Sequence, residues 1–290
     1  MIKIKSNKIV LLDSLFDGYI YIEDGKIIEV SKENKPADKE YDYTGSFVSP
    51  GFIEIHTHGG GGYPFINNTV DDVINACNFH LKHGTTTILP TVTAGPFEVM
   101  KKATLNVVEA LKTGKIKSNV PGVHLEGPYL SKDQAGAQCP DFITPPIKEE
   151  YVPFVEEYGK YIKKWTYAPE NDKNGEFAKF ISSHNIIPSI GHSNAIYDDV
   201  LTAVNNGATM VTHLYSCTST ITRDHGFRRL GVIESAYLLD DLTCEIIADG
   251  KHLPLDLIKL ILKCKGIEKT VLVTDSLEIA GTDIKEGLMS

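Results

Sequence analysis

GFIEIHTHGGGG, residues 51–62, joins an apolar run of strand length to two histidines and then to four glycines. His56 and His58 lie two residues apart on the expected strand, and alternate residues of a strand project from the same face. Both imidazoles can therefore reach one metal ion. The chain contains ten histidines, so a His-x-His pair also arises by chance. The interpretation of this stretch depends on what the other strands carry.

Seven further apolar runs of strand length follow, separated mostly by segments with helical periodicity. Continuous apolar strands that alternate with helices are typical of a parallel sheet buried on both faces, and eight such units predict an α/β fold of the (β/α)8 TIM type over residues 47–290. A doubly wound open sheet is the alternative architecture. The runs are TTTILPTV (85–92), VPGVHLE (120–126), KKWTYAP (163–169), IIPSIGH (186–192), ATMVTHL (208–214), CEIIAD (244–249) and TVLVTD (270–275).

Residues 1–46 have a different pattern of apolar and polar residues from the rest of the chain. They alternate apolar and polar residues in short runs, and Asp24-Gly25 supplies a two-residue turn within YIYIEDGKIIEV. We therefore expect a small antiparallel β unit that precedes the barrel.

Composition limits the classes of partner. A hydrophobic fraction of 42% and a charged fraction of 23% are those of an ordinary globular protein, and the net charge of -9 argues against nucleic acid and anionic membrane as partners. The five cysteines show no framework spacing, and the N-terminus carries no export signal, so we expect reduced thiols and a cytoplasmic location.

Polar side chains end several of the predicted strands. Glu126, His192 and His213 end the third, fifth and sixth strands, and in a barrel these ends meet at one mouth. One carboxylate and two imidazoles form a ligand set of catalytic zinc sites, although each residue alone could be an ordinary core or surface side chain. Asp275 stands at the tip of the eighth strand, where it can accept and return a proton as a general base and acid; a helix N-cap is the alternative role. His252 lies just beyond the seventh strand.

Six motifs, in order and across essentially the whole chain, resemble the amidohydrolase superfamily and, within it, the N-acetylglucosamine-6-phosphate deacetylase family. They are PGFIEIHTHGGGG, HLEGPYLS, GHSNA, THLYS, IADGKH and LVTDS. The resemblance implies hydrolysis of the acetamide of an N-acetylated amino sugar 6-phosphate. It also implies a barrel of the metal-dependent hydrolase kind with a small β-sandwich domain, and a homodimer.

Carried over by position, the resemblance assigns roles to the residues at the barrel mouth. Glu126, His192 and His213 become the principal metal ligands, with zinc as the expected ion, and Asp275 becomes the catalytic acid and base. His252 matches a histidine that contacts the substrate and helps to position its acetyl carbonyl. His56 and His58 match a pair that helps to hold a second metal in some members, so one or two ions are expected.

The resemblance also implies a sugar site and a phosphate site. Ala137, Gln138, Ser216 and Cys217 match residues that line the sugar, although the family usually has His at the position of Gln138 and Asn-Ala at that of Ser216-Cys217. Arg223 is the expected phosphate ligand, acting across the dimer interface in relatives, because a planar guanidinium suits a phosphate. Arg228 and Arg229 are competing candidates.

Alternatives to this function stay open at the sequence level. Relatives continue beyond the eighth strand, whereas this chain stops at GTDIKEGLMS, so we expect an incomplete β-sandwich. The substrate could be N-acetylgalactosamine 6-phosphate. The protein could also be another amidohydrolase, acting on a cyclic amide or a dipeptide, or an inactive homologue that only binds metal.

Overall fold

The computed structural model describes residues 1–284, and the chain divides into two compact units. The smaller unit is Met1–Phe52, and the larger unit is Ile53–Ser290. Every residue of the expected site belongs to the larger unit. The last residues of the expected barrel domain, 285–290, lie outside the described range.

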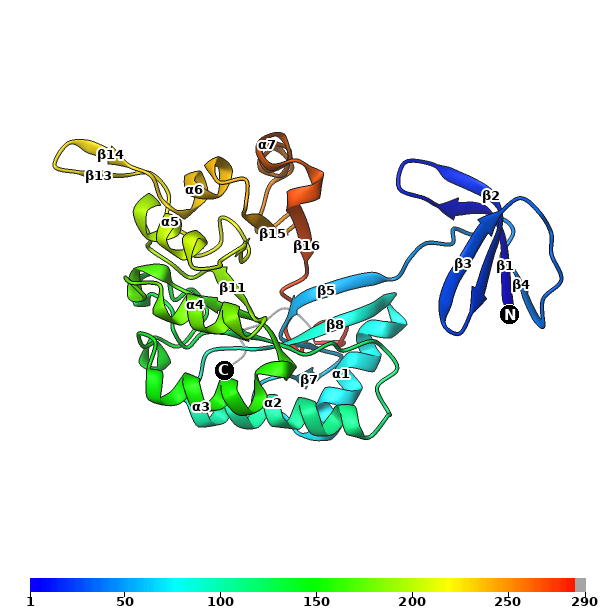
Figure 1. Ribbon diagram of the computed structural model, residues 1–290, viewed down its shortest axis with the longest axis horizontal. Helices are drawn as coiled ribbons and strands as arrows, with labels where there is room; N and C mark the ends of the chain where they lie inside the picture. The colour runs from blue at the N-terminus through cyan, green and yellow to red at the C-terminus, as the bar shows by residue number, and fades with distance from the viewer. Residues whose placement is uncertain (285–290) are drawn as a thin grey trace. The chain divides into compact units, whose positions relative to one another are not determined.

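The smaller unit is one four-stranded sheet with the strand order β3-β2-β1-β4 (Figure 1). Its strands are β1 (Ile2–Val10), β2 (Leu15–Glu23), β3 (Lys26–Ser31) and β4 (Lys39–Asp42). The predicted turn joins β2 to β3, and Asp24 and Gly25 have positive φ angles of 50° and 74°. β4 pairs parallel with β1. The sheet is therefore mixed and not wholly antiparallel as expected, because residues 32–38 carry the chain from one edge to the other.

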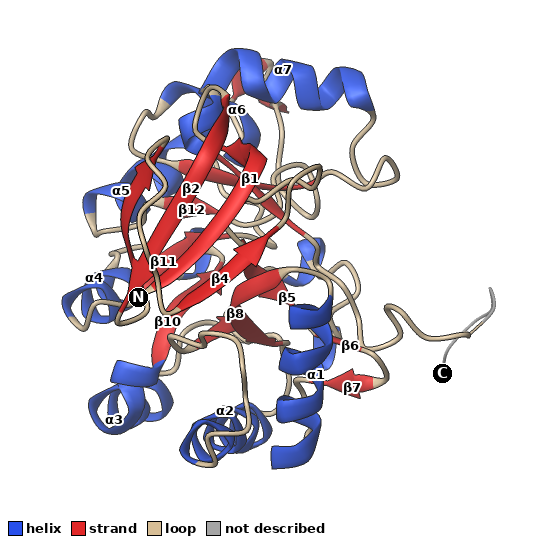
Figure 2. Cartoon of the chain, turned by 90° about the vertical axis from the view of Figure 1, so that its right-hand side faces the viewer, coloured by secondary structure: helices blue, strands red, loops and turns tan. Residues whose placement is uncertain are grey.

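Eight strands of the larger unit are hydrogen-bonded in chain order, as the predicted barrel requires. They are β5 (Phe52–Thr57), β8 (Thr85–Val92), β9 (Val123–Glu126), β10 (Ile162–Tyr167), β11 (Ile187–Ile190), β12 (Met210–Val211), β15 (Thr243–Ile247) and β16 (Thr270–Val273). The helices are α1 (Val70–Lys82), α2 (Phe97–Lys112), α3 (Lys148–Tyr158), α4 (Glu176–Ser183), α5 (Tyr197–Asn205), α6 (Val232–Leu238) and α7 (Leu255–Lys265). Figure 2 shows these helices on the outside of the strands.

Contacts between the first and last strands bring the barrel close to closure. The backbone N–H of Asp275 donates to the carbonyl of His56 (2.9 Å), and that of His58 donates to the carbonyl of Ser276 (2.8 Å). The buried carboxylate of Glu54 accepts from the backbone N–H groups of both His56 (2.8 Å) and Thr274 (2.9 Å). The end of β16 is thereby fixed to β5 at the level where the histidine pair lies.

The two faces of the barrel strands differ in polarity. Outward residues such as Leu125, Trp165 and Ile246 are at most 1% exposed and pack against the helices. Inward residues form a buried, hydrogen-bonded polar column, in which the His124 ring lies between the hydroxyls of Thr91 (3.0 Å) and Thr166 (2.7 Å). The metal-ligand candidates stand at the carboxyl end of this column, so the barrel core itself supports the site.

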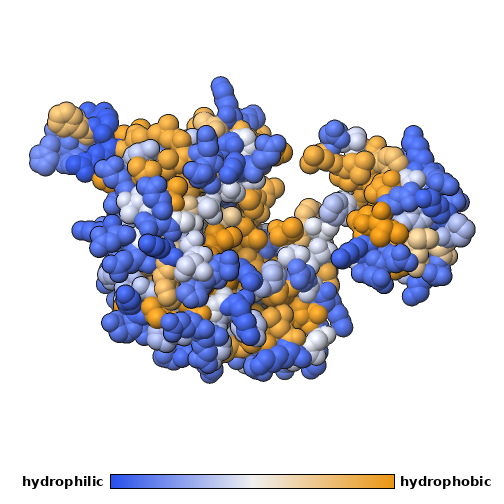
Figure 3. Space-filling model, in the orientation of Figure 1, coloured by the Kyte–Doolittle hydropathy of each residue, from blue (hydrophilic) through white to orange (hydrophobic). Residues whose placement is uncertain are grey.

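Several features lie outside the barrel core. β13 (Thr222–Asp224) and β14 (Phe227–Arg229) form a hairpin that projects from the larger unit beside α5 and α6 (Figure 1). Hydrophobic residues reach the surface of both units (Figure 3), and Leu272 on the outermost strand, β16, is 64% exposed. None of the helices in residues 1–284 combines the length and the apolar composition that a bilayer crossing requires.

Candidate metal centre and active site

The strand ends bring six predicted residues into one buried cluster. Glu126 is the last residue of β9, and its Oε1 lies 3.1 Å from Nε2 of His192 and 3.1 Å from Nε2 of His213. His58 follows β5 directly, and its Nε2 lies 3.2 Å from Oε2 of Glu126 and 3.0 Å from Oδ1 of Asp275. These side chains, which are far apart in the sequence, therefore lie close together, as expected for residues at the ends of barrel strands.

Hydrogen bonds fix how two of the imidazoles face Glu126. Nδ1 of His192 lies 2.9 Å from the carbonyl of Gln134, and Nδ1 of His213 lies 3.1 Å from the carbonyl of Ser216. A carbonyl oxygen only accepts, so Nδ1 carries a hydrogen in each ring and Nε2 is the ring atom that faces Glu126. A positive charge between Nε2 and the carboxylate, either a proton or a metal ion, would stabilise each of these contacts.

His56 gives a second indication of a cation. Its Nε2 is buried and lies 3.3 Å from both Oε1 of Glu126 and Oδ1 of Asp275, yet it has no hydrogen-bond partner among the described residues. Within residues 1–284, three groups of three residues have one potential ligand atom per residue, and the three atoms of each group lie within 4.8 Å of one another. They are His56-His213-Asp275, His56-His58-Glu126 and Glu126-His192-His213. Imidazole and carboxylate donors arranged in this way fit one or two divalent cations.

The carboxylates perturb the titration of the cluster. Burial alone would lower the pKa of His58, but its hydrogen bonds with Asp275 and Glu126 raise that pKa to about 10. Burial likewise opposes protonation of His192, but Cys217 and Glu126 raise the pKa of His192 to about 10. The neighbouring histidines, against the effect of burial, hold the pKa of Glu126 well below its usual range and that of Asp275 at about 2. Protons on His58 and His192 thereby offset the negative charge of the carboxylates, whereas burial lowers the pKa of His213.

The backbone of the site is strained at three of the predicted residues. His192, His213 and Asp275 have φ angles of 47°, 27° and 49°, in the left-handed region that non-glycine residues rarely adopt. Each such residue costs on the order of 1–3 kcal/mol, and such strain clusters at functional sites. The turns end β11, β12 and β16 just before these residues and redirect their side chains into the barrel mouth.

The sequence did not indicate which groups lie beneath the cluster. Oε2 of the fully buried Glu245 lies 3.2 Å from Nδ1 of His56, and the other oxygen pairs with the ammonium group of Lys164. Lys164 lies in the predicted strand KKWTYAP and Glu245 in CEIIAD. A signal was available, since both residues are charges within otherwise apolar strands and therefore need a buried partner.

The expected sugar-site residues surround the cluster. Gln138 donates through Nε2 to Oε2 of Glu126 (2.7 Å), and one amide hydrogen remains for a ligand. Ser216 contributes its carbonyl to His213, while Cys217 approaches His192 and lies against Gly136, where a Cβ would come within 2.4 Å of its Sγ. Ala137 is exposed in the same loop as Gln138.

In the structure, His252 and Arg223 have no contact with the cluster and form other interactions. His252 is half-exposed in the loop after β15, and its Nδ1 lies 2.9 Å from Asp249. Arg223 is exposed on β13 and lies directly opposite Arg228 of β14. Arg229 forms an ion pair with Asp224, whereas neither Arg223 nor Arg228 has a carboxylate partner within residues 1–284.

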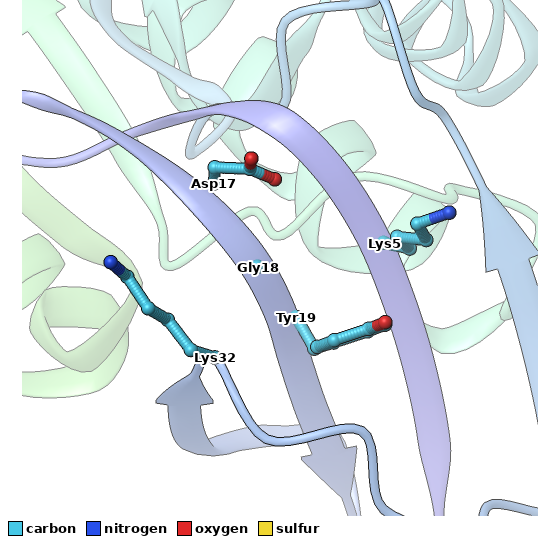
Figure 4. A pocket seen from close by; sticks show the side chains of 5 residues that line it. All are labelled: Lys5, Asp17, Gly18, Tyr19 and Lys32. Atoms are coloured by element: carbon cyan, nitrogen blue, oxygen red, sulfur yellow. The ribbon is translucent and has the colours of Figure 1, made fainter.

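A hollow in the smaller unit is not a competing site. It is lined by Lys5, Asp17, Gly18, Tyr19 and Lys32. Figure 4 shows the Lys5 and Lys32 side chains pointing away from each other, and Lys5 is already paired with Asp42. No set of side chains converges there on a common ligand position.

Comparisons with known proteins agree with this geometry. The amidohydrolase family model matches residues 47–286. An N-acetylglucosamine-6-phosphate deacetylase of Bacillus subtilis is 34% identical over 278 residues, which are 94% of this chain and 69% of that protein. An N-acetylgalactosamine-6-phosphate deacetylase of a Shewanella species is 34% identical over 256 residues, covering 86% of this chain and 62% of that protein.

The fold of this chain is also similar to that of a solved structure. The N-acetylglucosamine-6-phosphate deacetylase of Pasteurella multocida superposes with a TM-score of 0.89 at 30% identity. The match covers 99% of this chain and 74% of that one. The likeness therefore includes both units.

Proposed function

We infer that this chain, which belongs to the amidohydrolase family and within it to the N-acetylglucosamine-6-phosphate deacetylases, hydrolyses N-acetylglucosamine 6-phosphate to glucosamine 6-phosphate and acetate. The observation that carries the proposal is the buried cluster of Glu126, His192 and His213 facing Asp275 and the histidine pair. Amide hydrolysis requires an electrophilic group at the carbonyl and a base near the attacking water, and this cluster supplies positions for both.

We propose zinc as the metal, in one or two positions. Glu126, His192 and His213 would hold one ion, and His56 and His58 would help to hold the other. When bound, a divalent ion acts as a Lewis acid that polarises the acetyl carbonyl and makes water more acidic. Carboxylate and imidazole ligands are those that zinc commonly takes in hydrolytic enzymes, which supports this choice of ion.

Asp275 is the proposed base and acid. The carboxylate accepts one proton from the attacking water while the new bond forms between the water oxygen and the acetyl carbon. It then returns that proton to the amine nitrogen as the carbon–nitrogen bond breaks. The contact between its Oδ1 and Nε2 of His58, at 3.0 Å, and the hydrogen bond from its backbone N–H to the carbonyl of His56 hold the carboxylate at the barrel mouth.

His252 and the loop residues are proposed to bind the substrate. Asp249 engages Nδ1 of His252, which leaves Nε2 available for the acetyl oxygen. Ala137, Gln138, Ser216 and Cys217 are proposed to line the sugar. The enzyme is expected to work in the cytoplasm, and the five free cysteines support a reducing location.

The phosphate is proposed to bind Arg223 from a second copy of the chain. Arg223 and Arg228 are exposed, face each other across the β13–β14 hairpin and have no carboxylate partner in the described part of the chain. Like charges directly opposite each other repel, so an anion between them would be stabilising. Because the hairpin projects from its own barrel (Figure 1), a homodimer would bring it to the site of the partner.

The test is acetate release from N-acetylglucosamine 6-phosphate, with metal content measured on the same sample. We expect turnover by the native chain, and we expect Asp275→Asn to lose about a thousandfold in kcat while it keeps its metal. Asp256→Asn, an exposed change on α7, is the matched control. A native rate in Asp275→Asn would refute the assigned base.

The same assay separates the alternatives. The Shewanella relative makes N-acetylgalactosamine 6-phosphate the second candidate substrate, and a higher kcat/KM for that sugar would favour it. Unphosphorylated N-acetylglucosamine should be a much poorer substrate if phosphate is recognised. Turnover of a cyclic amide or a dipeptide alone, or metal binding without any turnover, would reject the proposed reaction.

A further inference from the structure

Gln138 is the one amide side chain in direct contact with the carboxylate of Glu126 among the described residues. It is 9% exposed, and its Nε2 donates to Oε2 of Glu126 at 2.7 Å. Its Oε1 accepts from the hydroxyl of Thr93 (2.6 Å) and from the backbone N–H of Ala94 (3.1 Å). The amide group is thus held on both sides.

The hydrogen bonds decide which atom of the amide faces Glu126. A backbone N–H can only donate, so the atom opposite Ala94 must be the amide oxygen. The amide nitrogen therefore faces the carboxylate, and rotating the group by half a turn would set two donors against each other at Ala94 and two acceptors against each other at Glu126. Gln138 consequently supplies a fixed, uncharged donor to one particular oxygen.

This donor makes the two oxygens of Glu126 unequal. Oε1 accepts nothing from Gln138; it faces Nε2 of both His192 and His213 at 3.1 Å and, at the longer distance of 3.3 Å, Nε2 of His56. Oε2, which faces His58 at 3.2 Å, shares its lone pairs with the Gln138 amide. A hydrogen bond withdraws electron density from the oxygen that accepts it, so Oε2 is the weaker of the two potential ligands.

We propose that Gln138 is a positioning residue that aims Oε1 of Glu126 at the His192–His213 position and weakens Oε2, the oxygen that faces His58, as a ligand for an ion at the His56–His58 position. The two metal positions then differ in affinity, with the tighter ion at His192 and His213. This inference rests on the proposed function only in assuming that the cluster takes divalent ions, and it makes no use of the substrate.

The experiment is a zinc titration of the chelator-treated chain against a chromophoric competitor, with total metal measured independently. For the native chain we expect two dissociation constants at least about tenfold apart. In Gln138→Met, which removes the donor at similar size, the tighter position should weaken by about 10–100-fold, because groups that orient metal ligands have effects of this size. The weaker position should tighten, so that the two constants approach each other.

The ratio of the two constants separates positioning from a general loss of structure, which would weaken both positions together. Thr93→Val removes only one of the two bonds that hold the amide and should shift the ratio less, in the same direction. Asn78→Leu, which removes an amide on α1, is the control and should leave both constants unchanged. An unchanged ratio in Gln138→Met and Thr93→Val, or equal constants in the native chain, would overturn the proposal whether or not the chain deacetylates sugars.

Discussion

At the residue scale, the site depends on charges buried below the metal-ligand candidates. Lys164 and Glu245 are 1% and 0% exposed, and Glu245 also accepts from Nδ1 of His56, which turns Nε2 of that ring toward the cluster. Removing one member of a buried ion pair leaves the other charge without compensation, whereas neutralising both is often tolerated. The pair therefore couples the stability of the barrel to the orientation of His56.

Glu245→Gln should lower the free energy of unfolding by about 3–5 kcal/mol, because Lys164 is left buried without a counter-charge. The double variant Lys164→Met/Glu245→Gln should recover most of that loss, since the amide oxygen can still accept from His56. Urea denaturation of the native chain, both single variants and the double variant measures the coupling. A loss below about 1 kcal/mol in Glu245→Gln would show that the pair is unimportant.

Position along a strand predicts where a side chain lies, and the structure brings together the predicted strand-end residues His56, His58, Glu126, His192 and His213, while their roles as metal ligands stay a prediction. Sequence reasoning missed Glu245 and the contact between Gln138 and Glu126. Those contacts join interior or loop residues whose separation in space is set by the closed barrel and not by local periodicity.

At the element scale, the four glycines after His58 form the short strand β6 (Gly59–Gly60) and the turn that follows it, and the segment after β16 packs against them. The backbone N–H groups of Gly61 and Gly62 donate to the carbonyls of Ala280 (2.8 Å) and Glu278 (2.7 Å). A Cβ on Gly60 would lie 2.7 Å from the ring of Phe79. The glycine segment therefore needs its small residues to reach the segment that follows Asp275.

Gly60→Ala should destabilise the chain by about 1–3 kcal/mol, because the added methyl group overpacks the contact with Phe79. We expect kcat to fall as well, since the displaced glycine segment carries the segment that holds Asp275. Thermal unfolding of Gly60→Ala, Phe79→Ala and the double variant checks the cause, and the double variant should lose less than the sum of the singles.

Gly95→Ala is the control for this series, because its Cβ would meet nothing closer than 3.9 Å. Strictly additive losses in the Gly60–Phe79 pair would mean that the ring is not what excludes a side chain at Gly60. The sequence showed the glycines, but it could not show that Phe79 and the residues after β16 lie against them.

The strands illustrate how far periodicity predicts elements. Each of the eight predicted apolar runs overlaps a barrel strand, but β12 is only Met210–Val211 where the run spans 208–214. The ladder ends early because His213 adopts a φ of 27°, which strand pairing does not allow. Left-handed turns of this kind are imposed by the site, so hydrophobic pattern alone does not reveal them.

At the scale of the whole molecule, the β13–β14 hairpin is a feature that the sequence does not predict, although the arginines on it are the expected candidates for phosphate binding. Phe227 is 77% exposed near the hairpin turn, and Arg223 and Arg228 carry uncompensated charge beside it. An exposed aromatic residue next to paired cations is typical of a contact surface and unusual for a solvated loop. These features are the physical basis for expecting a dimer whose two sites are each completed by the other chain.

Complementation between two impaired variants tests that expectation. Arg223→Ala should lower kcat/KM for the phosphorylated sugar by about 10–100-fold through loss of charge-assisted bonds to phosphate, while Asp275→Asn lacks the base. If the arginine acts in the partner's site, a mixed dimer contains one site with both Asp275 and Arg223. The unsorted co-expressed protein should then give about a quarter of the native rate, because random pairing makes about half of the dimers mixed, and mixed dimers isolated through two affinity tags should give about half of it. Sedimentation of the same samples measures the mass, and mixed dimers no more active than their parents would place Arg223 in the site of its own chain.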